Sequence, residues 1–106
     1  MSPRSHAIDL SNFPDALRDI PQWALDPSRL ALHRRFEFGN FAQAFAFMTE
    51  MATYSEAHQH HPEWSNVYGT VEVTLTTHDA GGITERDMAW AKEADAVFAR
   101  HTSASS

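Results

Sequence analysis

The chain has 106 residues, the usual size of one domain, so we expect one compact unit over residues 1–106. Eight basic against fourteen acidic residues give a net charge of −6 with no basic run, which argues against binding to nucleic acid. There is no cysteine, and no apolar run approaches the roughly 18 residues of a membrane span. We therefore expect a soluble, cytoplasmic protein with no nucleic-acid or membrane partner.

The first third of the chain predicts a short helix and a pair of strands. Residues 1–11 and 101–106 are polar or low in complexity, and we expect both ends to be flexible. A helix over residues 14–20 can begin with Pro14 in its first turn and must end before Pro21. Residues 30–38 alternate between apolar and polar side chains, which predicts a strand, and residues 23–25 are a shorter partner for it.

The middle of the chain predicts a long helix with an unusually wide apolar face. Gly39 ends the preceding strand, and Asn40 is a suitable N-cap for a helix that runs to about Ala57. Its apolar arc spans roughly 180°, against about 100° for a helix that rests on one core. We expect the outer stripe to contact a second copy of the chain. The two stripes are Phe41, Phe45, Met48 and Ala52, and, as the outer one, Ala44, Phe47, Met51 and Tyr54.

The last third predicts a strand and a helix. Residues 67–77 alternate in a β-rich composition, with a split or bulge at Gly69. Thr84 and Asp87 form a capping pair for a final helix with an inward apolar face. Neighbouring strands without crossover helices predict an α+β fold, with an antiparallel sheet and helices on one face. The residues expected to face inward are Ala91, Ala94, Val97 and Phe98.

A cluster of ionisable side chains stands where the long helix must end, in Glu56-Ala57-His58-Gln59-His60-His61-Pro62-Glu63-Trp64. Proline disfavours the α conformation in the residue before it, so the chain leaves the helix at His61. If the last turn stays helical, Glu56 and His60 are neighbours one turn apart, and the carboxylate can orient the imidazole. This arrangement suits proton transfer.

Two other interpretations of the histidines stay open. Histidines near a helix C-terminus can simply be solvated side chains that favour the negative end of the helix dipole. A zinc ion could be held by His58 with His61, or by His60 with His78. Against zinc, the chain has no HExxH spacing and no cysteine.

Other candidate residues also have ordinary structural explanations. His78 follows the strand predicted over residues 67–77 and could be a surface residue at its end. Asp87 is explained by helix capping alone. Trp23 and Trp64 could pack in the core or stack on a flat ligand.

Seven residues at defined spacings carry a more specific signal. The run Glu56, His60-His61-Pro62, Tyr68, His78 and Asp87 resembles the signature of the pterin-4a-carbinolamine dehydratases, small lyases that recycle pterin cofactors. The resemblance covers about residues 17–97. The flanking segments agree, among them Phe41-Ala42-Gln43-Ala44-Phe45-Ala46-Phe47-Met48, Asn66-Val67-Tyr68, Leu75-Thr76-Thr77-His78 and Gly82-Ile83-Thr84.

The resemblance implies a fold, an assembly and a set of site residues. The fold would be a four-stranded antiparallel sheet under three helices, and the assembly a homodimer or homotetramer through the helix at residues 41–54. It implies no metal and no cofactor. The catalytic residues would be His60, His61 and His78, the supporting residues Glu56 and Asp87, and the substrate-binding residues Trp23, Pro62, Trp64 and Tyr68.

The implied reaction explains why histidines are needed. A 4a-hydroxytetrahydropterin loses water when a proton reaches the C4a hydroxyl and another leaves a ring nitrogen, which gives the quinonoid dihydropterin. Imidazole, with an ordinary pKa of about 6.5, suits both transfers near neutral pH. Some relatives also act as dimerisation cofactors of homeodomain transcription factors, so the alternative is a protein-interaction module that uses the helix surface.

Overall fold

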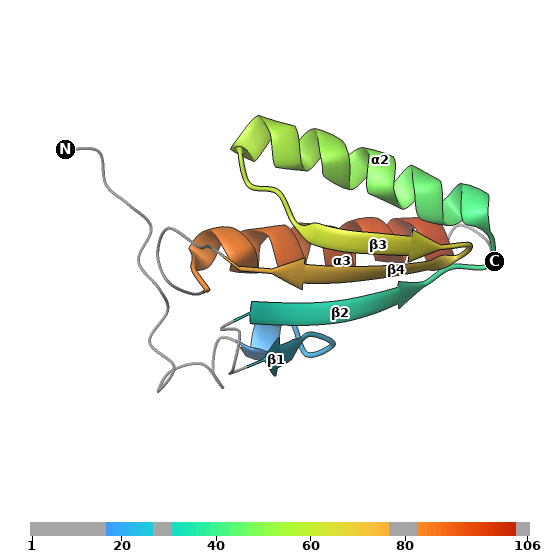
Figure 1. Ribbon diagram of the computed structural model, residues 1–106. Helices are drawn as coiled ribbons and strands as arrows, with labels where there is room; N and C mark the ends of the chain where they lie inside the picture. Colours follow the sequence, from blue (N-terminus) through green and yellow to red (C-terminus); the bar gives the residue numbers. More distant parts are fainter. Residues whose placement is uncertain (1–16, 27–30, 77–82, 104–106) are drawn as a thin grey trace.

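The computed structural model describes residues 17–26, 31–76 and 83–103, which form a four-stranded sheet with two long helices on one face (Figure 1). All neighbouring strands are antiparallel, and their order in the sheet is β1-β2-β4-β3. The α+β fold and the four-stranded antiparallel sheet are therefore confirmed. The elements are a 3-10 helix at Leu17–Asp19, β1 at Ala24–Asp26, β2 at Ala31–Glu37, α2 at Phe41–His58, β3 at Glu63–Val67, β4 at Thr70–Leu75 and α3 at Glu85–Ser103.

The third expected helix is absent from the described residues. The helix expected over residues 14–20 is represented there by the single 3-10 turn Leu17–Asp19, and residues 14–16 lie outside the described part. Pro21 ends this segment. The segment before Pro21 is therefore too short for a stable α-helix. Among the described residues, no helix is long and apolar enough to cross a membrane.

Strand β2 forms where alternation predicts it, and β1 is the shorter partner expected before it, one residue further along the chain than expected. Leu25 pairs with Leu32 in the antiparallel ladder, and the alternate residues Leu32 and Phe36 are fully buried under the helices. Next to them, Arg34 donates to Asp95 of α3 at 2.6 Å, and the Trp23 indole donates to the same carboxylate at 2.8 Å. These two bonds tie the edge of the sheet to α3.

The strand predicted over residues 67–77 is in fact two strands joined by a tight turn at Tyr68-Gly69. Val67 pairs with Thr70, so the turn has two residues, and Tyr68 has the left-handed φ of 51° that such hairpins require. A Cβ on Gly69 would come within 2.6 Å of the Phe38 carbonyl oxygen. The division at Gly69 is thus confirmed, but Val67 does not share the buried face of β4 and is 76% exposed.

The polar composition of β3 explains why the sequence did not predict it. Its residues, Glu-Trp-Ser-Asn-Val, contain only Trp64 as a large side chain on the helix-covered face, opposite Val73. The strand lies at the edge of the sheet, with β4 as its one neighbour among the described strands. Pairing with β4, and not its own apolar pattern, defines it.

The capping predictions for both helices are confirmed. The Asn40 side chain accepts from the Gln43 backbone N–H at 2.8 Å, and the Asp87 carboxylate accepts from the Thr84 N–H at 2.9 Å. The inward face of α3 is also confirmed, because Ala91, Ala94 and Val97 are buried and Phe98 packs against the core. Helix α3 continues to Ser103, so residues 101–103 are helical, and the expected flexibility of the ends stays a prediction.

The outer stripe of α2 is the opposite of the one expected. Phe47 and Met51 are fully buried within the chain, whereas Phe41 and Phe45 are 47% and 56% exposed. The rings of Phe41 and Phe45 stack on each other, with centroids 5.7 Å apart. Both stripes are apolar, so the pattern of α2 alone does not indicate which of them the sheet selects.

Candidate functional site

The candidate site is built on the corner between α2 and β3. Helix α2 ends at His58, and Gln59 follows in the left-handed conformation, with φ 53° and ψ 41°. The backbone N–H groups of Gln59 and His60 both return to the Ser55 carbonyl, and the His60 bond measures 3.1 Å. The turn ends the helix before His60, so the expected pairing of Glu56 with His60 is wrong.

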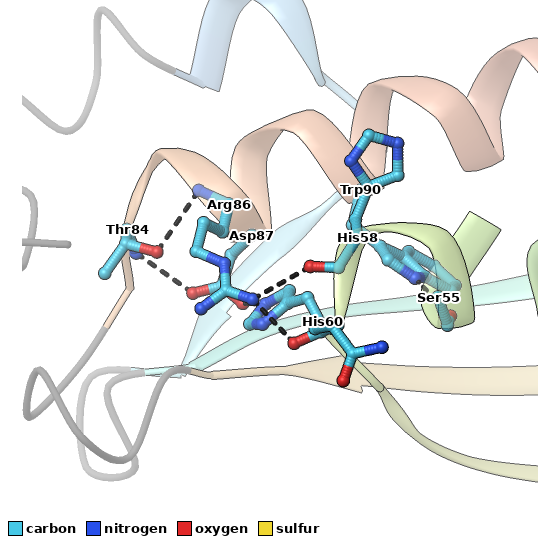
Figure 2. Close-up of polar contacts among 8 residues, drawn as sticks. Ser55, His58, His60, Thr84, Arg86, Asp87 and Trp90 are labelled. Carbon is cyan, nitrogen blue, oxygen red and sulfur yellow. Dashed lines mark hydrogen bonds and ion pairs between the residues drawn. The ribbon is translucent and has the colours of Figure 1, made fainter. Parts of the chain in front are cut away.

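His60 turns into the protein and is held by a buried carboxylate. Its Nε2 lies 2.5 Å from Oδ1 of Asp87, and the two residues are 8% and 0% exposed. The other Asp87 oxygen accepts from the Thr84 N–H, so one side chain caps α3 and orients the imidazole (Figure 2). Because a carboxylate is only an acceptor, Nε2 carries a proton and Nδ1 is the ring atom left for exchange in the neutral imidazole.

His61 turns the other way and is paired on the surface. Its Nε2 lies 2.6 Å from Oε2 of Glu56, and both side chains are more than half exposed. Consecutive residues thus carry two imidazoles, each oriented by its own carboxylate, one inside and one outside. Such a pair can hold or release protons in two different directions from one corner of the backbone.

A pocket of about 210 Å³ opens beside His60, between the end of α2 and the start of α3. Tyr54 and His58 form one wall, with their rings stacked at 4.1 Å between centroids. Burial, together with the nearby negative charge of Glu93, raises the pKa of Tyr54, so its phenol is neutral at ordinary pH. The pocket is lined by Tyr54, His58, His60, Glu85, Arg86 and Ala89.

The remaining predicted residues occupy different places. Tyr68, 68% exposed, lies at the hairpin tip after β3, whereas His61 lies before the start of that strand, which is roughly 17 Å long. Trp23 is 4% exposed, in the core against Phe36 and Trp90. Trp64 is half-buried, and its ring meets the edge of Trp90 at 6.2 Å between centroids.

Pro62 is half-buried between His61 and the start of β3. His78 lies outside the described residues, so its expected approach to His60 and His61 stays a prediction. In the described part of the chain, no three His, Asp or Glu side chains converge as a metal-binding group. The independence from metal likewise stays a prediction, to be tested with a chelator.

Sequence reasoning missed two polar residues of this region. The Ser55 hydroxyl, buried on the apolar face of α2, accepts from the Trp90 indole at 2.9 Å. Nη2 of Arg86 donates to the carbonyl oxygens of His58 and Gln59, at 3.0 and 2.6 Å (Figure 2). A serine among apolar helix positions was a visible signal for the first contact. The second joins segments far apart in the sequence and left no pattern.

The fold and the corner together define a small α+β domain with paired imidazoles at a helix end, and comparisons with known proteins identify its family. A family model described as pterin 4 alpha carbinolamine dehydratase matches residues 7–97. The chain therefore belongs to the pterin-4a-carbinolamine dehydratase family.

Individual relatives agree with this assignment. A protein of Rhizorhabdus wittichii, provisionally named a pterin-4-alpha-carbinolamine dehydratase, is 53% identical over 83 residues, covering 78% of this chain and 86% of that protein. A protein of Bordetella avium with the same provisional name is 49% identical over 100 residues, covering 94% and 90%.

Two solved structures are also similar. A transcriptional coactivator/pterin dehydratase from Brucella melitensis superposes with a TM-score of 0.84 at 40% identity, covering 87% of this chain and 98% of that one. A pterin dehydratase-like protein identified as a RuBisCO assembly factor in the alpha-carboxysome superposes with a TM-score of 0.64 at 29% identity, covering 73% and 89%. One of these two similar structures is thus described by an assembly role.

Proposed function

We propose that the protein is a hydro-lyase that dehydrates 4a-hydroxytetrahydropterins to quinonoid dihydropterins in pterin recycling in the cytoplasm. The observation that carries this proposal is the pair of consecutive imidazoles, His60 held by buried Asp87 and His61 held by Glu56. Family membership supports it independently. His78 is proposed as the third catalytic histidine.

The reaction needs two proton transfers and no electron transfer. One imidazolium gives its proton to the C4a hydroxyl, the C–O bond breaks, and water leaves. A neutral imidazole accepts the proton from a ring nitrogen, so the atoms balance as substrate minus H2O. Acid and base catalysis of this kind contributes about 10²- to 10⁴-fold per group.

The carboxylates support the imidazoles in different ways. Asp87 fixes the ring orientation and the proton position of His60 from a fully buried site. Glu56 orients His61 from the surface, where solvent weakens the interaction. We further propose that Pro62, Trp64, Tyr68 and Trp23 contribute to substrate binding, directly or through the core, in a homo-oligomer assembled through α2.

The test is a rapid-mixing assay of carbinolamine decay with the purified protein, in buffer and in EDTA. We expect acceleration over the uncatalysed decay that EDTA does not change, and loss of most of it in the triple variant His60→Ala, His61→Ala, His78→Ala. Activity that chelation abolishes and zinc restores would overturn metal-independent catalysis. A triple variant as active as the wild type would overturn the enzyme assignment.

The alternative function is a protein-interaction module of the same fold. The stacked and exposed rings of Phe41 and Phe45 favour it, because they present apolar surface on α2. If the triple variant keeps its partner binding while the wild type fails to accelerate carbinolamine decay, this alternative becomes the better account.

A further inference from the structure

The corner that carries His60 and His61 has a conformation that needs external support. Gln59 adopts the left-handed conformation with a side chain present, a conformation that non-glycine residues adopt only where the surroundings enforce it. The last carbonyl groups of α2 also lack partners within the helix, as at every helix end. Ser55 and Glu56 have local partners, because the N–H groups of Gln59 and His60 donate to the Ser55 carbonyl and the Gln59 amide donates to the Glu56 carbonyl at 2.9 Å. The carbonyl groups of His58 and Gln59 have a partner outside α2.

Arg86, in the first turn of α3, is that partner. Its Nη2 donates to the carbonyl oxygens of both His58 and Gln59, so one nitrogen bridges the last helical residue and the left-handed one. The guanidinium is a cation at the negative end of the α2 dipole, which adds favourable charge. Bonds from a charged donor are shorter and stronger than neutral ones.

The next residue of α3 acts on the same corner from another side. Asp87 holds the ring of His60, while Arg86 holds the backbone directly before it (Figure 2). Successive side chains on a helix point about 100° apart, so the two reach different groups. The first turn of α3 therefore bonds to both the backbone before His60 and the imidazole ring of His60.

We propose that Arg86 is a positioning residue that fixes the corner at His58 and Gln59, and through it the directions of the His60 and His61 rings. Without the guanidinium, the left-handed turn at Gln59 loses its two cross-links to α3. The His60 ring then no longer stays on Asp87, and His61 loses its approach to Glu56. We call the contact of Arg86 with the carbonyl groups of His58 and Gln59 the clamp. The expected effect of its loss on kinetics rests on the proposed function, whereas the clamp itself does not.

The experiment compares Arg86→Met and Arg86→Lys with the control Arg100→Met. Arg100 also lies on α3 and also reaches α2, through an exposed pair with Glu50 at 3.2 Å, but at the far end of the helix. The first readout is amide hydrogen exchange at His60, whose N–H bonds to the Ser55 carbonyl. The second is long-range proton–nitrogen NMR of the histidine rings, with His33 on β2 as an internal reference.

We expect Arg86→Met to speed His60 amide exchange about tenfold or more and to shift the ring signals of His60 and His61. Those of His33 should stay in place, Arg86→Lys should recover most of the difference, and Arg100→Met should match the wild type. Unchanged exchange and unchanged rings in Arg86→Met would overturn the clamp. A melting curve by circular dichroism shows whether each variant is folded. If Arg86→Met is unfolded, Arg86→Lys is compared with the wild type in its place.

Kinetics separate positioning from ligand binding, because Arg86 also lines the pocket beside His60. A positioning role predicts that Arg86→Met lowers kcat about tenfold or more while KM stays within about threefold. A raised KM with unchanged kcat would assign Arg86 to the ligand and overturn positioning. If the wild type does not act on carbinolamines at all, the proposed function fails, and the exchange and ring data still decide the clamp.

Discussion

Replacement of Asp87 by Asn tests whether one buried carboxylate supports both the fold and the candidate chemistry. Its two oxygens have different partners, with Oδ1 at 2.5 Å from Nε2 of His60 and Oδ2 at 2.9 Å from the Thr84 N–H. An asparagine of the same shape has only one oxygen. Its amide NH₂ must therefore face either the Thr84 N–H or the ring N–H of His60, and one donor opposes another.

The loss of stability can be estimated from these contacts. Asp87 is fully buried, and a buried donor left without its acceptor costs about 1–3 kcal/mol, or more when the lost acceptor is charged. The retained oxygen keeps one hydrogen bond, so we expect Asp87→Asn to lower the free energy of unfolding by about 2–4 kcal/mol. At about 4–8 °C per kcal/mol for a domain of this size, the melting temperature falls by about 8–30 °C.

The catalytic effect follows from the proton on the imidazole. An amide NH₂ that faces Nε2 is a donor, so it favours the tautomer with the proton on Nδ1 and removes the acceptor proposed there. Under the proposed function, kcat should fall about 10²-fold or more, with pterin affinity within a few-fold. Melting by circular dichroism and rapid-mixing kinetics at 25 °C measure the two effects on one preparation.

Asp95→Asn is the matched control, because it makes the same change on the same helix at a carboxylate that is 25% exposed and holds Arg34. It should lower the melting temperature less and leave kcat within about twofold. The reasoning fails if Asp87→Asn melts like the wild type, because the carboxylate would then contribute nothing to the fold. Equal losses of kcat in both variants would attribute the kinetic effect to general destabilisation.

Three further predictions concern single side chains. His61→Ala should lower kcat about 10²-fold and Glu56→Ala less, since Glu56 acts only through its exposed contact with His61; steady-state kinetics check this, and equal losses would contradict it. Phe45→Glu should dissociate the assembly in sedimentation while the chain stays folded by circular dichroism, whereas Phe47→Glu, at a fully buried position, should unfold the chain. A monomeric wild type at micromolar concentration would refute the interface. The raised pKa of Tyr54 contributes stability that is present below its ordinary value of 10.0 and lost as the pH rises through the folded-state value, so Tyr54→Phe should flatten the alkaline fall in melting temperature.

The sequence predicted the elements whose apolar period is strong and local. Alternation located β2 and β4, β1 was expected as the shorter partner of β2, and capping residues located the starts of α2 and α3. Strand β3 was missed because it needs apolar side chains on one face only, and Trp64 is the single large side chain on that face. One apolar residue is too few to show an alternating pattern. The stripe of α2 that contains Phe47 was expected to face outward but is buried. Which stripe faces inward depends on packing against residues of other elements, such as Phe36 of β2.

The candidate site was predicted in its residue types but not in its pairs. Signature spacing identified His60, His61, Glu56 and Asp87. The pairing of Glu56 with His60 was expected separately, on the assumption that the helix continues to His60. The left-handed turn at Gln59 moves the register by one residue, so that Glu56 reaches His61 and His60 becomes available to α3. Gln59 is not a glycine, and the sequence around it contains no local signal for that turn.

The turn depends on a segment 27 residues further along the chain, because Arg86 bonds to the Gln59 carbonyl and Asp87 to the His60 ring. In the sequence, Thr84 to Asp87 has a complete local explanation as a helix cap, and the structure confirms that explanation. Two of these four residues, Arg86 and Asp87, also hold the corner after α2, a role that only the packing of α2 against α3 creates. A residue that satisfies a local rule can therefore carry the site as well, and the local rule conceals the second role.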